Sequence, residues 1–329
     1  MTLPAISIIT PSFNQGEFLE ECIDSVLSQN YPNLEYIIMD GGSSDGSVEI
    51  IKKYEKYLAY WQSQPDGGQY NAINDGFKKT TGEIMAWLNS DDKYHHNAFF
   101  KVAHVFSTHE NVEWLTGRHT LWDKDGAVQL IETEWLPEHS REKFFQKQYD
   151  KPWIQQESTF WRRSLWEKAG SGLATDLDYA GDLELWLRFF RFAPLYTVDA
   201  LLGGYRVHGN QKAALFMDKY REEAERVIDE ELLLCQHGNH SDLLPTPEPI
   251  TISLHELRKY RRDSLALAGV DRQGFADEAE LVCDYLLKRL LAQAETVQAL
   301  QSRLEQLTLT RIWRMTAPLR KVLDVFKRR

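Results

Sequence analysis

Short apolar runs alternate with segments of helical periodicity through the first hundred residues, and this alternation restricts the fold more than any other feature of the chain. The strand-like runs are residues 5–10, 34–40, 58–63 and 82–92, and the helix-like segments between them are residues 17–29, 47–57 and 70–79. Buried strands that alternate with amphipathic helices are typical of βαβ units. We therefore predict an α/β fold with a Rossmann-like, mostly parallel sheet and helices on both faces.

Polar side chains follow three of these strands at the point where each strand ends. Pro11, Ser12 and Asn14 follow the first run, residues 40–45 follow the second, and residues 89–92 end the fourth. Right-handed crossovers bring the carboxyl ends of parallel strands to one edge of a sheet, where open α/β sheets bind ligands. The sequence therefore predicts a ligand site at this edge.

The pattern becomes less regular in the second half of the chain. The elements that we expect there are a hairpin around a turn at residues 123–126, a helix at 182–192 and strand material at 195–211. Gly203 and Gly204 are expected to break this strand material. From Lys212 onward the sequence is mostly helical, and the Pro- and Asp-containing residues 237–249 form the best candidate boundary.

Charge and composition exclude several classes of protein. The formal net charge of −11 argues against a nucleic-acid-binding protein, because surfaces that neutralise phosphates are basic. The cysteines Cys22, Cys235 and Cys283 are far apart and odd in number, which predicts neither a disulfide framework nor a zinc site. Neither a signal peptide nor a run of about 18 apolar residues is evident. We therefore expect a cytoplasmic protein with at most peripheral contact with the inner face of the plasma membrane.

The C-terminal region has a separate pattern, in which seven positions are spaced alternately by four and three residues, as in a heptad seam. These positions are Leu286, Leu290, Gln293, Val297, Leu300, Leu304 and Leu307. Self-association as a coiled coil and a solvated helix packed back on the enzyme would both give this spacing. Residues 311–329 then contain seven Lys or Arg and one Asp among apolar side chains. This basic tail suits either a membrane interface or docking on the acidic remainder of the chain.

The sharpest local motif is LNSDD at residues 88–92, which places two acids directly after a buried strand. Mg²⁺ and Mn²⁺ prefer oxygen ligands and commonly take one or two carboxylates together with phosphate oxygens. Asp91 and Asp92 are therefore candidate metal ligands beside a diphosphate. The alternative is an ordinary loop or helix cap.

Two Gly-rich segments accompany these acids. Residues 40–46, DGGSSDG, would let a base or ribose approach the backbone closely. Asp40 would accept a hydrogen bond from a nucleobase N–H or, alternatively, from the amides of its own turn. Residues 65–76, PDGGQYNAINDG, open a predicted helix whose first amides can bind an anion.

The segments ITPSFNQGEFLEECIDSVLSQNYPNLEYIIMDGGSSDGS and SQPDGGQYNAINDGFKKTTGEIMAWLNSDD resemble family 2 of the inverting glycosyltransferases, and the resemblance covers about residues 5–215. It implies the GT-A fold, a nucleotide-diphosphate-sugar donor, a glycan or glycolipid acceptor and usually a divalent metal, Mn²⁺ or Mg²⁺. The donor-binding residues that we assign with it are Pro11, Ser12, Asn14, Asp40, Gly41, Asp45, Asp66, Asn74, Asp91 and Arg206.

The same resemblance makes NSDD the counterpart of the family's Asp-x-Asp metal motif, with Asn89 in place of the first acid. The metal role then falls on Asp91 and Asp92, joined by His208 from the segment YRVHGNQ. A lone His after a strand is also commonly structural, and that alternative stands beside the metal role.

The family also carries an acid beside the acceptor at the start of a helix. Here YAGDLELWLRFF gives Asp182, with Gly181 in place of the common Glu. A carboxylate there would take the acceptor proton as the acceptor oxygen attacks the anomeric carbon from the face opposite the diphosphate. The alternative is an N-cap, and a helix N-terminus would lower the pKa of this acid rather than raise it.

Two further segments look similar to parts of related transferases. QQESTFWRR at residues 155–163 resembles the acceptor side of the family, which assigns acceptor contacts to Gln156, Glu157 and Trp161, although Trp161 suits the core equally well. The C-terminal TRIWRMTAPLRKVLDVFKRR resembles tails of bacterial cell-surface polysaccharide transferases.

We therefore expect a GT-A glycosyltransferase domain at residues 1–215, a helical region at 216–280, and a coiled coil with a basic amphipathic tail at 281–329. The expected activity is transfer of a sugar from a nucleotide-diphosphate sugar to an acceptor hydroxyl in polysaccharide synthesis. The main rival is a catalytically inactive nucleotide-binding or scaffold protein. A nucleotidyltransferase would need a basic Gly-rich loop after its first strand, which PSFNQGEF lacks.

Overall fold

The computed structural model describes residues 3–132, 136, 138–147, 153–209, 211–237 and 244–267. The predicted coiled coil and basic tail lie outside these residues. The elements of the first half are β1 (Ile6–Ser12), α1 (Gly16–Leu27), β2 (Leu34–Asp40), α2 (Ser47–Tyr54), the 3₁₀ helix η1 (Glu55–Tyr57), β3 (Tyr60–Ser63), α3 (Gln69–Phe77), β4 (Ile84–Trp87), β5 (Lys93–Tyr94), α4 (Ala98–Thr108), β6 (Trp114–Thr116), β7 (Thr120–Trp122) and β8 (Val128–Ile131). Those that follow are α5 (Arg141–Phe145), η2 (Gln156–Ser158), β9 (Thr159–Arg162), α6 (Arg163–Lys168), α7 (Gly181–Phe190), β10 (Tyr196–Thr197), β11 (Gly203–Arg206), α8 (Lys212–Leu215), α9 (Met217–Gln236) and α10 (Leu254–Leu267).

The main sheet has seven strands in the order β10-β6-β9-β4-β1-β2-β3. β1 pairs in parallel with β2 and β4, and β2 pairs in parallel with β3, while β9 runs antiparallel to both β4 and β6. A second sheet of four strands has the order β5-β11-β7-β8, and β7 and β8 form the predicted hairpin. The predicted α/β fold with a mostly parallel sheet is confirmed.

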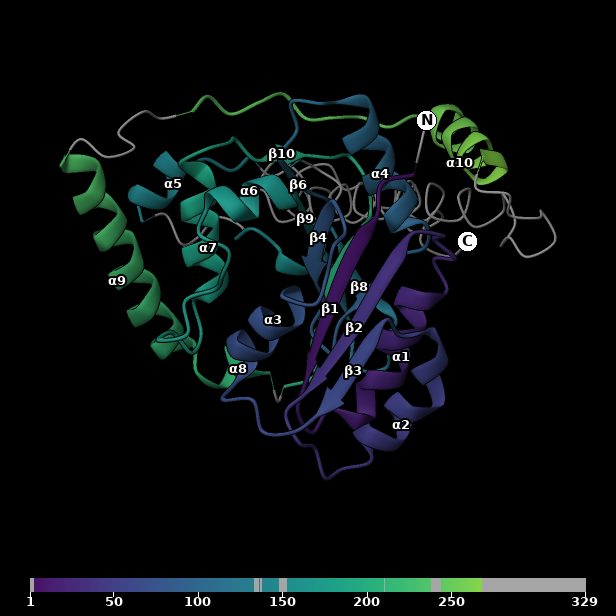
Figure 1. Ribbon diagram of the computed structural model, residues 1–329. Coiled ribbons are helices and arrows are strands. Elements are labelled where there is room, and N and C mark those ends of the chain that lie inside the picture. Colours follow the sequence, from purple (N-terminus) through teal and green to yellow (C-terminus); the bar gives the residue numbers. More distant parts are fainter. Residues whose placement is uncertain are drawn as a thin grey trace, which may run out of the picture. The chain divides into compact units, whose positions relative to one another are not determined.

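Helices cover both faces of the parallel strands, as expected for βαβ crossovers. α1 and α2 lie on one face, and α3 lies on the other (Figure 1). All seven residues of β1 and all four of β4 are buried, because each strand is covered on both sides. The carboxyl ends of β1, β2 and β3 point toward the end of the molecule at which α8 lies (Figure 1).

The centre of the core is a cluster of four fully buried indole rings from Trp87, Trp114, Trp161 and Trp186. Trp186 of α7 stacks on Trp87 of β4 at a centroid distance of 5.8 Å and on Trp114 of β6 at 5.6 Å. These contacts attach α7 to the sheet beside the carboxyl end of β4. Trp161 has no exposed surface and packs at 5.5 Å from Trp87. The structure therefore places Trp161 in the core, and the assignment of an acceptor contact to it is not kept.

Gly203 and Gly204 were predicted to break a strand, but they are the first two residues of β11. A Cβ atom at Gly203 would lie 2.0 Å from the carbonyl oxygen of Glu157, so only glycine allows β11 to approach η2 this closely. This approach brings Glu157 next to the first residue of β11. The two glycines therefore serve the site and not a chain break.

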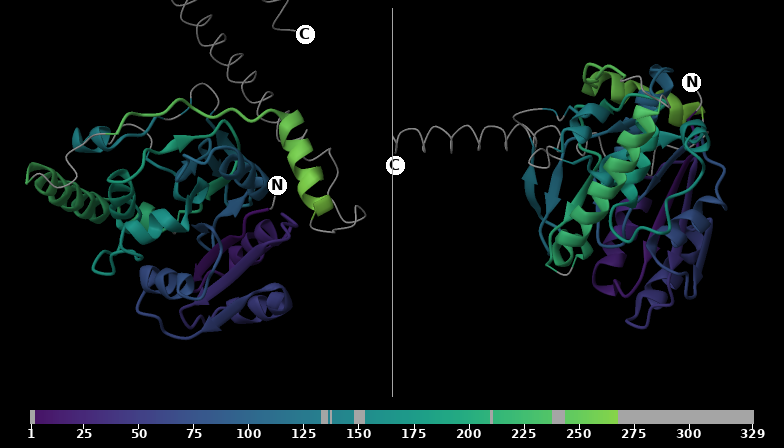
Figure 2. Two further views of the ribbon diagram at one scale, coloured as in Figure 1. Left: turned by 45° about the horizontal axis from the view of Figure 1, so that its top comes forward. Right: turned by 90° about the vertical axis from the view of Figure 1, so that its left-hand side faces the viewer.

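The packing continues without interruption past residue 215. α9 begins directly after α8 and packs along α7. It is the long green helix in both views of Figure 2. Glu231 of α9 is buried and binds the guanidinium groups of Arg141 and Arg191. None of the described helices is long and apolar enough to cross a membrane.

The position of Trp161 leads to a prediction. Trp161→Ala should lower the free energy of unfolding by about 3–5 kcal/mol, because it leaves a large cavity in the core. Trp161→Phe should cost much less, since the buried indole N–H has no hydrogen-bond partner to lose. Urea unfolding measures both, and an acceptor KM that rises in the Phe variant without loss of stability would return Trp161 to the acceptor site.

Candidate active site

Four carboxyl groups gather at the carboxyl-terminal edge of the main sheet. Asp91 and Asp92 follow β4, Glu157 belongs to η2, and Asp182 is the second residue of α7. Each of the other three contributes to the electrostatic environment of Glu157. Topology predicted this position for Asp91 and Asp92, whereas Glu157 and Asp182 reach it on η2 and α7.

Asn89 organises the polar network below these acids. Asn89 Nδ2 donates to Asp92 Oδ2 at 3.2 Å and to Gln156 Oε1 at 3.3 Å, and the side-chain oxygen Oδ1 accepts from Gln69 Nε2 at 2.7 Å. Gln156 is buried and donates to the carbonyl oxygen of Trp87 at 2.6 Å. A carboxylate at position 89 could not donate to Asp92. The departure from Asp-x-Asp thus removes one charge and adds one donor in a crowd of acids.

Asp92 and Glu157 form a buried pair of carboxyl groups. Burial raises the pKa of Asp92 well above its ordinary value, and the charges of Glu157 and Asp91 act in the same direction. Burial also raises the pKa of Glu157. Asp92 Oδ1 accepts the backbone N–H of Arg206 at 2.8 Å, so both of its oxygens have protein donors. Asp92 is thus a buried anchor between β4 and β11.

Asp91 is more accessible than Asp92 and lies beside His208. Its Oδ2 is 3.1 Å from His208 Nε2, and its side chain is 16% exposed. The imidazole packs on Phe18 at a centroid distance of 4.5 Å, and its buried Nδ1 has no partner. The predicted pair of Asp91 and His208 therefore meets in the structure, whereas Asp92 faces the interior.

Arg206 does not occupy the position expected for a phosphate ligand. It is 1% exposed, and its guanidinium donates to the carbonyl oxygens of Asp91 and Lys124 and to Glu21 Oε2. Because these donors are engaged inside the protein, Arg206 holds the loop of Asp91 in place. The assignment of Arg206 to the donor site is corrected to this structural role.

Two residues that were predicted to bind the nucleotide-sugar donor, Asn14 and Asp45, join the loop after β1 to the loop after β2. Asp45 accepts the Gly16 N–H at 2.8 Å and the Ser47 hydroxyl at 2.6 Å. Asn14 Oδ1 accepts the Ser44 N–H at 2.9 Å. Burial would raise the pKa of Asp45, but the hydrogen bonds from Ser47 and Gly16 outweigh it and lower that pKa. These contacts hold both loops at the edge of the sheet.

Asp40 realises the alternative in which it satisfies its own turn. Its Oδ2 accepts the N–H groups of Gly42 and Ser43 and the hydroxyl of Ser63, while Oδ1 accepts the hydroxyl of Ser43. The side chain has no exposed surface. A nucleobase could not reach it in this arrangement, so its assignment as a donor contact is corrected.

Asn74 is likewise engaged inside the protein. Its amide makes two bonds with the backbone of Leu173, one donated to the carbonyl oxygen at 3.0 Å and one accepted from the N–H at 2.8 Å. Asn74 therefore fixes the segment after α6 and is removed from the donor contacts.

The other residues that were predicted to bind the sugar donor lie near an aromatic side chain that the sequence analysis did not identify. Phe13 stands between Ser12 and Asn14 and is 61% exposed. A Cβ atom at Gly41 would lie 3.2 Å from both Phe13 and Asp66, so these three residues border one small space. Pro11 and Ser12 are buried at the end of β1, and the hydroxyl of Ser12 has no partner. The signal in the sequence is an aromatic residue that directly follows the end of a buried strand, between Ser12 and Asn14.

Asp182 stands apart from the donor loops on the first turn of α7. The N-cap is Ala180 and its side chain makes no capping bond, so Asp182 is not the cap that the alternative interpretation required. Burial raises the pKa of Asp182 to about 6, against hydrogen bonds from the amides of Leu183 and of Asp182 itself. The expectation that the helix N-terminus would lower this pKa is therefore wrong, because desolvation outweighs it.

A cluster of buried acids beside Gly-rich loops, at the carboxyl edge of a parallel sheet, is typical of ligand sites in α/β enzymes. The sequence profile described as Glycosyl transferase family 2 matches residues 7–168. An uncharacterized glycosyltransferase of Mycobacterium tuberculosis is 32% identical over 228 residues, which cover 66% of this chain and 82% of the relative. The chain belongs to glycosyl transferase family 2.

Solved structures agree with this assignment at the level of fold. Staphylococcus aureus TarS in complex with UDP-GlcNAc superposes with a TM-score of 0.55 at 19% identity, over 70% of this chain and 66% of that chain. A Pyrobaculum calidifontis mannosyltransferase in complex with GDP-Man and Mn²⁺ gives a TM-score of 0.50 at 18% identity, over 94% and 87% of the two chains. These similarities confirm the predicted GT-A fold.

The structural role of Arg206 can be tested against the phosphate role. Arg206→Ala should lower the free energy of unfolding by about 3 kcal/mol, because it removes the donors to Glu21 Oε2 and to the carbonyl oxygens of Asp91 and Lys124. Lys53→Ala is the control, since the Lys53–Glu20 pair is exposed and should contribute less than about 1 kcal/mol. Weaker nucleotide binding with unchanged unfolding would instead support the phosphate role.

Proposed function

We propose that this glycosyltransferase moves a sugar from a nucleotide-diphosphate sugar to a hydroxyl group of a glycan or glycolipid, with inversion at the anomeric carbon. The observation that carries the proposal is the placement of Asp182, a carboxyl group with a pKa of about 6 on an element separate from the acids after β4. A base with such a pKa is largely ionised near neutral pH and still accepts a proton well.

In the proposed step, Asp182 takes the proton of the acceptor hydroxyl. The acceptor oxygen forms a bond to the anomeric carbon, and the bond from that carbon to the diphosphate oxygen breaks. The electron pair of the broken bond leaves with the nucleoside diphosphate. A single displacement of this kind inverts the anomeric configuration.

The donor side would be formed by the loops after β1 and β2. The exposed ring of Phe13 offers an apolar face for a base, and the bond from the Asn14 N–H to Ser43 Oγ joins the two loops beside it. The proposal is supported by the UDP-GlcNAc and GDP-Man complexes of the two structural neighbours, although it does not choose between these nucleotides. Asp45 would act by joining the loops.

Asp91 and His208 are suited to hold Mn²⁺ or Mg²⁺. Within the residues that the structure describes, no group of three or more potential ligand side chains surrounds one point. A site with few protein ligands fits these metals, which commonly take their other ligands from substrate phosphates and water. A bound cation would neutralise charge on the diphosphate and relieve the repulsion among Asp91, Asp92 and Glu157. The Mn²⁺ complex of the mannosyltransferase gives further support.

The pathway that we propose is synthesis of a bacterial surface polysaccharide at the inner face of the plasma membrane. Its support is the similarity of the C-terminal tail to those of polysaccharide transferases. Retention of Asp91 and Asp182 argues against the alternative of an inactive scaffold. A scaffold would not need charged side chains at this site to bind its partners.

The metal assignment predicts a specific loss. Asp91→Asn should abolish the increase in UDP or GDP affinity that Mn²⁺ produces, because the amide is a weaker ligand for a hard cation. Calorimetric titration with and without Mn²⁺ measures this increase. Asp75→Asn, at an exposed position of α3, is the control and should keep it. An unchanged metal effect in the Asp91 variant would remove Asp91 from the metal site.

The base assignment predicts opposite changes in activity and stability for Asp182→Asn. Turnover should fall by roughly 10²–10⁴-fold with donor affinity preserved. Wild-type kcat should also fall as the pH drops through about 6, because a protonated Asp182 cannot accept the acceptor proton.

The free energy of unfolding of the wild type should change with pH in the opposite direction to kcat. Because the pKa of Asp182 is higher in the folded state than in the unfolded chain, ionisation of Asp182 destabilises the fold. The free energy of unfolding should therefore fall as the pH rises from about 4 through about 6. Asp182→Asn should therefore be more stable by about 1–3 kcal/mol at pH 8 and equal to the wild type below pH 4. Wild-type turnover in the variant would exclude Asp182 as the base.

A further inference from the structure

The amino-terminal end of α7 is held by side chains that come from other helices. Residues 178–181, the base loop, immediately precede Asp182. Glu223 of α9 accepts three consecutive backbone N–H groups of this loop, from Asp178 at 3.0 Å, Tyr179 at 2.8 Å and Ala180 at 2.9 Å. A single carboxylate thus satisfies amides that no side chain of the loop satisfies.

The fourth amide of the base loop is held from the opposite side. Gly181 donates its N–H to the hydroxyl of Tyr70 on α3 at 2.9 Å. A Cβ atom at Gly181 would lie 2.6 Å from the Tyr70 ring, so a larger residue there would displace either the ring or the loop. This contact explains why glycine precedes Asp182 in this chain. The base loop is therefore fixed between α3 and α9.

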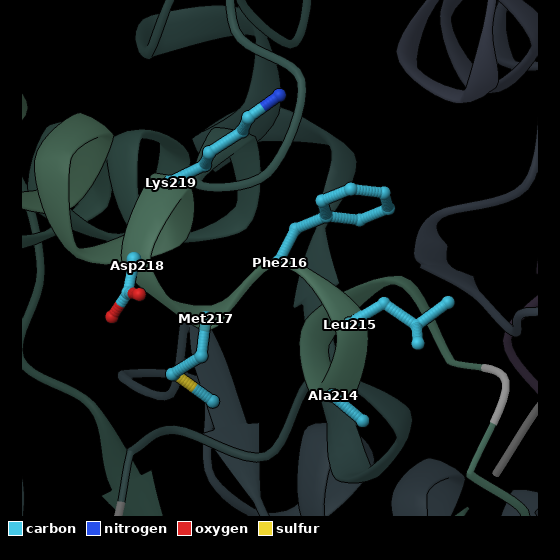
Figure 3. A pocket seen from close by; sticks show the side chains of 6 residues that line it. All are labelled: Ala214, Leu215, Phe216, Met217, Asp218 and Lys219. Atoms are coloured by element: carbon cyan, nitrogen blue, oxygen red, sulfur yellow. The ribbon is translucent and has the colours of Figure 1, made fainter.

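Lys212, the first residue of α8, and Phe216, which joins α8 to α9, add three further contacts to the base loop. Lys212 donates to the carbonyl oxygen of Asp178 at 2.7 Å and lies over the ring of Tyr179 at 5.1 Å. The ring of Phe216 packs against Tyr179 at a centroid distance of 5.6 Å. Phe216 is one of the residues 214–219, which line an open hollow of about 310 Å³ and are labelled in Figure 3. None of the four active-site acids, Asp91, Asp92, Glu157 and Asp182, lines this hollow.

α9 also holds the opposite end of α7. Glu231 lies eight residues after Glu223, about two helical turns, so both project from the same face of α9. Glu231 binds Arg191, the C-cap of α7, with Nε and Oε1 2.9 Å apart. The two glutamates therefore bind α7 at its two ends, and α9 fixes the position of α7 along its own axis.

We infer that Glu223 is a positioning residue for the reaction, which sets the location of Asp182 through the base loop, and that α9 is part of the catalytic unit. This inference rests on the proposed role of Asp182 as the base. Glu223 touches only backbone amides and acts through Asp182, because a small displacement of a base relative to the acceptor oxygen causes a large loss of rate. The predicted boundary at residue 215 would separate Glu223 from the loop that it holds.

The test compares Glu223→Gln with Glu222→Gln, an exposed neighbour on the same helix, in the full chain. Gln keeps one acceptor oxygen but directs an amide N–H₂ group at the loop. We expect Glu223→Gln to lower kcat by roughly 10-fold, with the Kd for UDP or GDP and the melting temperature unchanged. Amides of residues 178–181 should exchange with solvent at least about 10-fold faster by mass spectrometry. Glu222→Gln should change none of these quantities.

Turnover is measured as release of UDP from UDP-GlcNAc or of GDP from GDP-mannose, with water as the acceptor. A double-mutant cycle separates this inference from the proposed function. If Glu223 acts only through Asp182, Glu223→Gln should cause no further loss in the Asp182→Asn background. Wild-type kcat or unchanged amide exchange in Glu223→Gln overturns the inference while the base stands. Wild-type turnover in Asp182→Asn overturns the base itself.

Tyr70→Phe provides a second variant if Glu223→Gln does not fold. It removes the hydroxyl that accepts the Gly181 N–H and leaves the ring that packs on Gly181. A lower kcat with unchanged nucleotide affinity supports the positioning of the base loop. A wild-type kcat, together with unaltered exchange at Gly181, contradicts it.

Discussion

Concentrated negative charge at the edge of the sheet is the constraint on which the site depends. Asp92 and Glu157 are buried side by side, and burial makes ionisation of both more difficult, while the charge of Glu157 raises the pKa of Asp92 further. The protein compensates with donors and not with bulk solvent: the Asn89 amide and the Arg206 backbone both donate to Asp92. Arg206 in turn needs Glu21, which also binds Lys93. Burying the acids therefore determines which residues must surround them.

The elements of the first half of the chain were predictable because their signals are local. β2 spans Leu34–Asp40, the predicted residues, and α1 and α3 lie within two residues of their predicted limits. Periodicity reports which side of a helix or strand is buried, and this property does not depend on distant partners. The position of Asp91 at the edge of the sheet followed from topology in the same way, whereas Glu157 and Asp182 were assigned only through the family resemblance.

The individual roles of polar residues were less predictable, because they depend on partners far away in the sequence. Asn74 binds the backbone of Leu173, and Arg206 reaches back to Glu21. A motif shows that a polar side chain is needed but not whether it faces a ligand or the protein. The same limit applies to Glu223, one of several acids on a polar helix, whose function is visible only from the three amides that it binds.

The four buried tryptophans have a consequence for spectroscopy. Their ring centroids are 5.5 to 5.8 Å apart in the closest contacts, and the rings of Trp87 and Trp186 are inclined by only 9°. Indoles this close exchange excitation energy, and in apolar surroundings they emit at short wavelength. The chain has six other tryptophans, among them the exposed Trp153. The short-wavelength part of the emission, which comes from the buried cluster, should therefore respond strongly to loss of contact between α7 and the sheet and so report the position of α7.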